Sequence, residues 1–550
     1  MSASHPTQFQ IADLFESVAD AIPDRLALIA GASRLSFAEL DRRANRAAHA
    51  LAQRGIGPGM HVGIQLYNGS PYVELMLAAY KLRAVAINVN YRYGEAELAY
   101  LYDNADLRAL AFHRSLAGAV APALARLPGG APALLCVDDG SGEPLAGLEA
   151  EDYEAAQTRA SSERDFAARS PDDRYILYTG GTTGMPKGVV WRQEDFLMGA
   201  VFPQAFREER LPLRPEDVAA PLPLRPHNVT LISAPLMHGA AQWATLAAWW
   251  NGRGVLLYSE RRFDPRAIWR AIAAEGVTAL QVVGDAMARP LAEALTGEPD
   301  LDLSRLRILM SGGAILSEIA IEKLRARIPE LRVADGFGAS ETGWQGARIG
   351  RGGEGSPRFR MSRFTSVLDD ELRPIPPGSG RRGRVARSGR IPLGYYKDPE
   401  KTAQTFPTDA EGRRWVVAGD WATVEADGSV TVLGRGSVCI NTGGEKVFPE
   451  EVELALRSHP DVLDAVVVGV PDEKFGERIA AIAALRAGAE LSLAQLAAHA
   501  RGQIASYKLP RELHLVPPQQ MPRSPSGKPD YAWARRIALA GREPGATSPA

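Results

Sequence analysis

Apolar and polar residues alternate along the chain in two different periods. A helical period follows Ser36 and Glu39, which form a capping box ahead of apolar residues spaced three to four positions apart. Short apolar runs typical of buried strands occur at 61–66 and 84–89. A further helical spacing at 266–275 is followed by a strand-like apolar run at 277–283. Alternating helices and strands predict βαβ units with mostly parallel sheets.

The C-terminal part of the sequence has a different pattern. Helical spacing at 449–457 and 493–501 is combined with apolar runs at 463–470 and 478–485. At 550 residues the chain is also too long for one hydrophobic core. We therefore expect an α/β protein with a large N-terminal domain of βαβ subdomains (1–435) and a small α+β C-terminal domain (436–541). A disordered tail is expected at 542–550, where Gly, Pro, Ser and Ala are frequent.

Composition restricts the possible functions. The chain is 45% hydrophobic and 23% charged, and its net charge of −2 gives no electrostatic reason to expect nucleic acid binding. The two cysteines, Cys136 and Cys439, lie far apart among apolar residues, so we expect small buried side chains and no disulfide framework. No signal peptide or membrane-spanning run is expected. The expected location is cytoplasmic, with at most peripheral membrane contact.

The most informative stretch is YTGGTTGMPKGV at 178–189. Its glycines allow backbone N–H groups to approach a ligand, its threonines add hydroxyl donors, and Lys187 adds a positive charge. These groups suit a polyphosphate. The P-loop pattern does not apply, because Pro186 precedes the lysine and Gly188 follows it.

This stretch resembles the phosphate-loop signature of the adenylate-forming (ANL) enzymes, a superfamily of acyl-CoA synthetases, adenylation domains and luciferases. Further stretches follow in the family's order, so the resemblance covers nearly the whole chain. They are SGGA at 311–314, DGFGASETG at 335–343 after an apolar strand at 331–334, VAGD at 417–420, INTGGEKVFPEEVE at 440–453 and PSGK at 525–528. The resemblance implies an AMP-forming acid–thiol ligase that uses ATP, Mg²⁺ and CoA as co-substrate.

The resemblance also implies which residues contact the nucleotide. They are Thr179, Gly180, Gly181, Thr182, Thr183, Gly184, Lys187, Gly312, Gly313, Ala314, Asp335, Gly336, Phe337, Gly338, Ser340, Asp420, Arg435 and Lys528. Glu341 and Thr183 would hold Mg²⁺, and Glu341, Thr183, His238 and Lys528 would be catalytic. Asp420 would bind both ribose hydroxyls. Val417 and Ala418 depart from the family's usual Arg-Thr at these positions.

Two half-reactions follow from the resemblance. A carboxylate first attacks the α-phosphate of ATP, and Lys528 would stabilise the developing negative charge. No general base is needed, because a carboxylate is already ionised at neutral pH. The C-terminal domain would then rotate about the hinge residue Ser437, which is followed by Val438 where the family usually has an acid. Gly443, Gly444 and Glu445 would thereby reach the CoA channel.

The stretch at 234–250 is expected to border the acid. The residues predicted to contact the acyl group are His238, Gln242, Trp243 and Gly313. Small residues at 239–241 leave room for a bulky or long acid. Local phrases, including APLMHGAAQWAT at 234–245 and GASETGWQG at 338–346, resemble bacterial steroid side-chain and fatty acyl-CoA ligases.

Alternatives to this reading stay open at the level of sequence. They are a medium- or long-chain fatty acyl-CoA synthetase, an acyl-AMP ligase that loads a carrier protein, and a non-catalytic nucleotide-binding homologue. The intact Gly-Gly-Glu loop at 443–445 favours CoA over a carrier protein, and retention of Glu341 and Lys528 favours catalysis. The identity of the acid, the pathway and the oligomeric state stay open, with a homodimer as one alternative.

Overall fold

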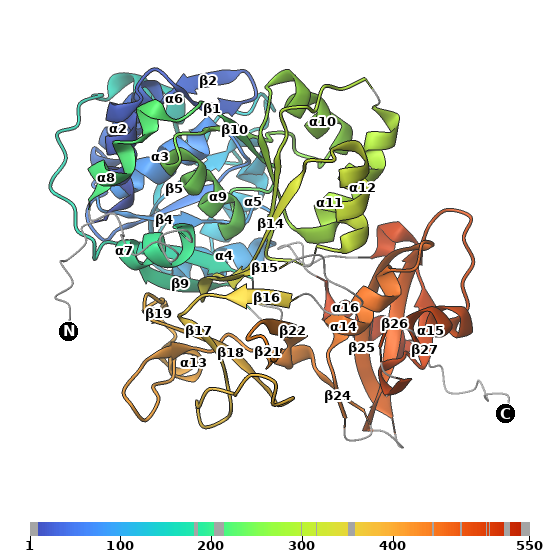
Figure 1. The fold of residues 1–550 in the computed structure, drawn as a ribbon. Coiled ribbons are helices and arrows are strands. Elements are labelled where there is room, and N and C mark those ends of the chain that lie inside the picture. The colour runs from blue at the N-terminus through green and yellow to red at the C-terminus, as the bar shows by residue number, and fades with distance from the viewer. Residues whose placement is uncertain are drawn as a thin grey trace. The chain divides into compact units, whose positions relative to one another are not determined.

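The computed structural model describes residues 9–180, 185–202, 214–298, 300–314, 316–349, 358–442, 445–472, 476–501, 503–504, 506–521 and 529–540. Contacts divide the chain into two compact units (Figure 1). The first contains Met1–Leu316, Ala320–Gln345 and Ser388–Pro407, and the second contains Ser317–Ile319, Gly346–Arg387 and Thr408–Ala550. Each unit is described by itself below.

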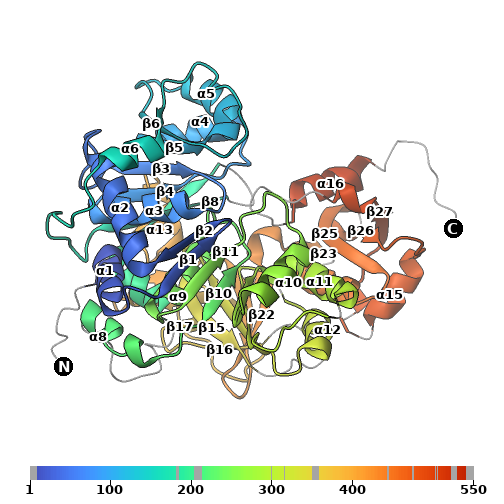
Figure 2. The ribbon, with the colours of Figure 1, turned by 90° about the horizontal axis from the view of Figure 1, so that it is seen from above.

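The first unit contains a parallel sheet with the strand order β4-β3-β5-β6-β7. Its strands are β3 (His61–Gln65), β4 (Val85–Asn88), β5 (Leu107–His113), β6 (Ala133–Val137) and β7 (Glu151–Asp152). Helices α2 (Phe37–Ala52) and α3 (Ser70–Lys81) cover one face, while α4 (Glu95–Asn104) and α5 (Ala117–Leu124) cover the other (Figure 2). Burial on both faces explains the continuous apolar runs of these strands.

A second set of strands in this unit has the order β14-β13-β12-β10-β11-β1-β2. The strands are β1 (Leu26–Ala30), β2 (Ser33–Ser36), β10 (Val229–Ile232), β11 (Gly254–Leu257), β12 (Ala279–Val282), β13 (Ile308–Gly312) and β14 (Arg332–Ala339). From β14 to β1 the pairs are parallel, and only β2 runs antiparallel to its neighbour. Helices α10 (Pro265–Ala274), α11 (Gly284–Ala294) and α12 (Glu318–Arg327) pack on one face, and α1 (Ile11–Ala21) and α9 (Gly239–Trp250) on the other.

A small antiparallel sheet completes the first unit. Strands β8 (Arg174–Thr179) and β9 (Lys187–Arg192) form a hairpin in which Thr179 pairs with Lys187. Strand β19 (Gly394–Tyr395) pairs with β9 on its other side. The remaining helices are α6 (Tyr153–Arg159), α7 (Gln193–Phe196), α8 (Pro215–Ala219) and α13 (Pro399–Thr405).

The second unit contains two sheets. One is antiparallel, with β16 (Arg358–Met361), β17 (Thr365–Leu368), β18 (Arg382–Ser388), β20 (Trp415–Val416), β21 (Asp420–Val424) and β22 (Val430–Arg435). The chain enters this unit within β15 (Gly343–Arg348). The other sheet contains β23 (Ile440–Thr442), β24 (Glu445–Val447), β25 (Val462–Asp472), β26 (Gly476–Leu485) and β27 (Glu512–Leu515). Helices α14 (Pro449–Arg457) and α15 (Leu493–Arg501) pack on one face of the second sheet, and α16 (Tyr531–Ala540) on the other.

The predicted α/β fold class is confirmed, and several element predictions are accurate. The capping box of Ser36 and Glu39 is present, and α14 and α15 have the predicted bounds. The strand predicted at 331–334 is longer, since β14 continues to Ala339. Cys136 is buried as expected, but Cys439 is only partly buried. The domain boundary predicted after residue 435 falls inside the second compact unit and stays a prediction. The tail at 542–550 lies outside the described residues.

Candidate active site

The predicted acid and adenine segments both follow carboxyl ends of parallel strands. The segment that carries His238 follows β10, and Gly313 and Ala314 follow β13. Strand β12 lies between β10 and β13, and β14 pairs with β13 on its other side. Ligands of open α/β sheets bind beyond the carboxyl ends of the strands. The fold therefore brings three predicted segments to one edge of the sheet: the His238 segment after β10, Gly313 and Ala314 after β13, and the Gly-rich stretch that ends β14.

Glycines keep the ends of β13 and β14 open. Gly312 pairs with Gly336, and Ser311 pairs with the buried Asp335. A Cβ atom at Gly338 would fall well inside the contact distance of the Gly343 carbonyl oxygen. Gly313 and Ala314 are exposed beyond the strand. Backbone is therefore exposed just beyond β13, where the adenine contacts are predicted.

Lys187 and Glu341 are connected through β19 and the turn after it. Lys187 Nζ lies 2.6 Å from Asp398 Oδ2, and it is 5.8 Å from the centre of the Tyr395 ring. The Tyr395 hydroxyl donates to Glu341 Oε1 at 3.1 Å. Hydrogen bonding from Lys187 lowers the pKa of Asp398. The predicted phosphate lysine and the predicted metal ligand thus share one tyrosine as a neighbour.

A second connection joins the hairpin to the Glu341 turn. The indole N–H of Trp191, on β9, donates to the Ser340 carbonyl at 3.1 Å. Within the turn, the Ala339 N–H donates to Thr342 Oγ1 at 2.9 Å, and the Thr342 N–H donates to the Ala339 carbonyl at 3.1 Å. Ser340 and Glu341 are therefore held at the end of β14 while their side chains stay partly exposed.

His238 immediately precedes α9, which presses closely on β8. A Cβ atom added to Gly239 would lie 2.5 Å from Leu177 Cδ2, so a larger residue where the helix begins would displace the Leu177 side chain. Gln242 is buried; its Oε1 accepts from the Tyr175 hydroxyl at 2.9 Å, and its Nε2 donates to the Leu236 carbonyl at 2.8 Å. The Gln242 amide is therefore occupied by protein partners, and its predicted contact with the acyl group stays a prediction.

One face of α9 is only partly buried and consists mostly of small side chains. It comprises Ala240, Trp243, Ala244 and Ala247, at helical spacing. Trp243 donates its indole N–H to the Tyr175 hydroxyl at 3.2 Å, which fixes the position of the ring. We refer to these four residues as the α9 face. Three of its four side chains are single methyl groups, and Trp243 is its one large aromatic ring.

In the second unit, the two predicted nucleotide contacts lie opposite each other. Asp420, at the start of β21, pairs with Arg435, at the end of β22. Gly419 adopts a positive φ of 97°, and its carbonyl accepts the Gly436 N–H at 3.0 Å. The main chain around Gly419 thus fixes the backbone position of Asp420, from which its carboxylate extends. Ser437, the predicted hinge residue, lies in a 3₁₀ turn, Gly436–Val438.

Part of the predicted site lies outside the described residues. This applies to Gly181, Thr182, Thr183 and Gly184 in the loop, to Gly443 and Gly444, and to Lys528. For Arg435, Ser437 and Glu445 only the backbone is described. The roles predicted for all of these residues stay predictions.

Three polar residues near the site carry no recognisable sequence signal of their own. Asn88 accepts from the Tyr178 N–H and donates to the Tyr178 and Met237 carbonyls. Tyr395 and Asp398 contact Glu341 and Lys187 as described above. Their partners are far away in sequence, so only the fold reveals them. The Gly394–Tyr395 pair after an Arg-rich strand offered at most a weak turn signal.

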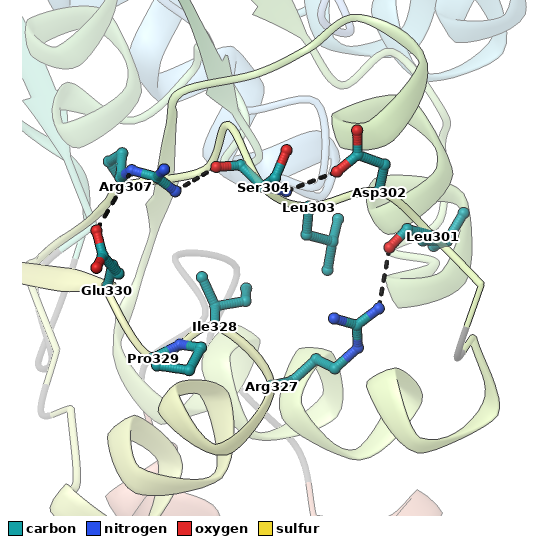
Figure 3. A pocket seen from close by; sticks show the side chains of 9 residues that line it. All are labelled: Leu301, Asp302, Leu303, Ser304, Arg307, Arg327, Ile328, Pro329 and Glu330. Carbon is teal, nitrogen blue, oxygen red and sulfur yellow. Dashed lines mark hydrogen bonds and ion pairs between the residues drawn. The ribbon is translucent and has the colours of Figure 1, made fainter.

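A shallow pocket lies elsewhere, between residues 301–307 and the turn after α12 (Figure 3). It measures about 190 Å³. The Arg327 guanidinium donates to the Leu301 carbonyl at 3.0 Å, and Arg307 lies 3.9 Å from Glu330. The two arginines that line the pocket thus already have protein partners, and none of the lining residues belongs to the predicted site. We do not assign this pocket to the substrates.

The described residues also bear on metal binding and on membrane crossing. They contain no group of three or more His, Cys, Asp or Glu side chains that could hold a metal ion. Protein sites commonly hold Mg²⁺ through one or two carboxylates and the phosphates of the substrate. Glu341 can supply one such carboxylate. No helix in the described part of the chain is long and apolar enough to cross a membrane.

Two family models match different parts of the chain. Residues 15–396 match the model of the AMP-binding enzymes, and residues 451–528 match that of the AMP-binding enzyme C-terminal domain. Together the two matches include Lys187, Glu341 and Lys528.

The chain is similar over nearly its whole length to curated proteins. It is 46% identical to a medium/long-chain-fatty-acid–CoA/3-oxocholest-4-en-26-oate–CoA ligase of Mycobacterium marinum, over 96% of each chain. It is 45% identical to a 3-oxocholest-4-en-26-oate–CoA ligase of Rhodococcus rhodochrous, over 96% of this chain and 95% of the relative.

Solved structures share the fold. A crystal structure of an anthranilate CoA ligase in complex with anthranoyl-AMP matches with a TM-score of 0.82. The match covers 98% of this chain and all of the other at 24% sequence identity, so it supports the architecture and nothing finer.

Proposed function

Because the chain belongs to the AMP-binding enzyme family and is an AMP-forming acyl-CoA synthetase, we propose that its acid is a steroid side-chain acid. The co-substrates of the family are ATP, Mg²⁺ and CoA. The observation that carries the proposal is the similarity to two relatives whose names include 3-oxocholest-4-en-26-oate. The α9 face supports it, since Ala240, Ala244 and Ala247 are small and only partly buried beside Trp243, which is a composition that suits a wide acid.

In this proposal, several described residues take part in the first half-reaction. Thr179 and Gly180 lead into the predicted phosphate loop, and Lys187 contributes a positive charge on the opposite strand. The Lys187 ammonium lies against Asp398, so phosphate oxygens would compete with this carboxylate for it. Glu341 presents a carboxylate that is oriented by the Tyr395 hydroxyl. Mg²⁺ bound there would neutralise charge on the phosphates.

The remaining assignments complete the proposed cycle. Lys528 would stabilise charge at the α-phosphate, and Asp420 and Arg435 would hold the rest of the nucleotide. Rotation about Ser437 would then exchange Lys528 for the loop that contains Gly443, Gly444 and Glu445. We place the enzyme in the cytoplasm, where ATP and CoA are both available.

A second candidate substrate is a medium- or long-chain fatty acid. The name of the Mycobacterium marinum relative includes both classes of acid. Linear acids need length more than width, so the two classes can be separated by narrowing the α9 face. Narrowing the α9 face should lower kcat/KM more for an acid that fills the width than for a linear chain that does not.

The test is a product assay by mass spectrometry. The purified chain receives ATP, Mg²⁺ and CoA with steroid side-chain acids, linear fatty acids of several lengths, or benzoates. Acyl-CoA and AMP from the steroid acids are expected. Thioesters from linear acids alone would overturn the steroid proposal, and acyl-AMP without thioester would overturn the assignment to CoA.

Two variants refine the assay. Ala244→Leu should reduce kcat/KM for steroid acids about 10-fold and for linear acids by less, because overpacking costs about 1–3 kcal/mol. Ala52→Leu, at an exposed position of the α2 helix, is the matched control. Lys528→Ala should lose adenylation but still convert a supplied acyl-AMP to acyl-CoA. Equal losses for both acid classes in Ala244→Leu would contradict the width argument.

A further inference from the structure

Asn88 occupies an unusual place at the end of β4. Strand β4 is the last strand of its sheet, and β8 is the last strand of the hairpin sheet beside it. The two strands are not paired through their backbones. Instead, the buried Asn88 side chain, only 5% exposed, reaches across to β8.

The Asn88 amide binds the backbone of Tyr178 as a peptide group would. Its Oδ1 accepts the Tyr178 N–H at 2.8 Å, and its Nδ2 donates to the Tyr178 carbonyl at 2.8 Å. This reciprocal pair needs a donor and an acceptor on one short, neutral side chain, which asparagine provides. Both polar groups of a buried residue are thereby satisfied without burying a charge.

The same amide makes a third hydrogen bond. Asn88 Nδ2 also donates to the Met237 carbonyl at 2.7 Å. Tyr178 directly precedes Thr179, with which the predicted phosphate-binding residues begin. Met237 directly precedes His238, on the predicted acid side. One side chain therefore connects the segments that would carry the two reactants.

A neighbouring asparagine shows what is special about this arrangement. Asn68 holds the same His238 segment: its Nδ2 donates to the Ala234 carbonyl at 3.1 Å, and its Oδ1 accepts the Leu236 N–H at 2.7 Å. Its other partner is the Tyr258 carbonyl, at 3.0 Å. Asn68 therefore holds the segment predicted to border the acid, and none of these hydrogen bonds reaches β8.

We propose that Asn88 is a positioning residue for adenylation, which sets the phosphate strand β8 and the His238 turn at a fixed separation. The inference rests on the proposed function. A carboxylate must approach the α-phosphate in line, and a misplacement of about 1 Å can cost about 10²-fold in rate. Binding of either substrate alone does not require the two segments to be in register.

The experiment separates adenylation from binding and from stability. The variants are Asn88→Ala, Asn88→Asp, Asn68→Ala and Asn45→Ala. Asn45 is a buried asparagine that contacts Asp41 and the Ser162 carbonyl, so its loss matches the cost of removing a buried amide. Asn88→Asp keeps an acceptor for the Tyr178 N–H but turns the donor into a second acceptor that faces two carbonyls. Pyrophosphate release gives kcat and both KM values, and thermal unfolding gives Tm.

Asn88→Ala should lower kcat for adenylation about 10²-fold, with the KM values for ATP and acid within about threefold of wild type. Supplied acyl-AMP and CoA should still react at near the wild-type rate, because the acid and the α-phosphate are already joined in acyl-AMP and no longer have to be aligned. Asn88→Asp should lose at least as much adenylation. Asn68→Ala should chiefly raise the KM for the acid, and Asn45→Ala should lower Tm without lowering kcat.

Several outcomes would overturn the inference. They are a wild-type kcat in Asn88→Ala, a fall in kcat that Asn45→Ala reproduces, and a change confined to the KM for ATP. Failure of the proposed function is distinct, because the wild-type chain would then form no acyl-AMP from any acid. In that case crystal structures of wild type and Asn88→Ala decide: unchanged separation of the Tyr178 and Met237 carbonyls would contradict the inference.

Discussion

The two compact units hold their predicted nucleotide residues in different ways. In the first, side chains from distant parts of the sequence act as braces: Trp191 binds the Ser340 carbonyl and Tyr395 binds Glu341. In the second, Asp420 and Arg435 are set by the pairing of β21 with β22. Side-chain braces can be removed one at a time, whereas a strand ladder can be altered only through its backbone. Substitutions should therefore have separable effects in the first unit and shared effects in the second.

The largest effect is expected from Glu341→Gln in the first unit. Glutamine is nearly isosteric and can still accept the Tyr395 hydroxyl, so the brace should survive while the charge is lost. Adenylation should fall about 10²-fold to 10³-fold, because a bound divalent cation supplies several kcal/mol. Pyrophosphate release measured against MgCl₂ concentration checks this, with a higher Mg²⁺ requirement expected. An unchanged Mg²⁺ dependence would remove Glu341 from the metal site.

The next effect contrasts two glycines. Gly338→Ala places a Cβ against the Gly343 carbonyl, a backbone atom that cannot turn away, and should cost about 3 kcal/mol of stability. Gly419→Ala has open space around the new methyl group but a φ of 97°, so it should cost only about 1 kcal/mol through backbone strain. Thermal unfolding compares the two. Equal losses would mean that the close approach of Gly338 to the Gly343 carbonyl costs no more than the backbone strain at Gly419.

A smaller effect is expected for Asp420→Asn in the second unit. An amide can accept only one of the two ribose O–H bonds that a carboxylate accepts, and a hydrogen bond to a charged group contributes about 1.5–3 kcal/mol. The KM for ATP should rise about 10-fold to 100-fold with little change in kcat. Steady-state kinetics with 2′-deoxy-ATP provides the control, since the variant should discriminate less between the two nucleotides. A fall in kcat alone would contradict the assignment to the ribose.

Sequence patterns predicted the elements far better than the braces. Helix α14 could be placed residue by residue, because Pro449 marks its start and its apolar positions repeat at helical spacing. The end of β14 could not, because the Gly-rich residues 335–339 carry no apolar alternation, although Asp335 and Gly336 pair with β13. The contacts of Asn88 were also invisible, since its partner Tyr178 lies 90 residues away. Local patterns report on local structure, whereas braces depend on which strand ends meet in the fold.

The smallest effect tests whether the first unit depends on its braces individually. Tyr395→Phe removes one hydrogen bond to Glu341 and keeps the ring near Lys187. The expected loss is about 1 kcal/mol, or about fivefold in adenylation rate, with a modest rise in the Mg²⁺ requirement. Tyr395→Leu removes the ring as well, and should add a further loss of about 0.5–1 kcal/mol from the cation–π contact. If Tyr395→Phe were as damaging as Glu341→Gln, the orientation of the carboxylate would matter as much as its charge. If Tyr395→Leu were no worse than Tyr395→Phe, Lys187 would be positioned by Asp398 alone.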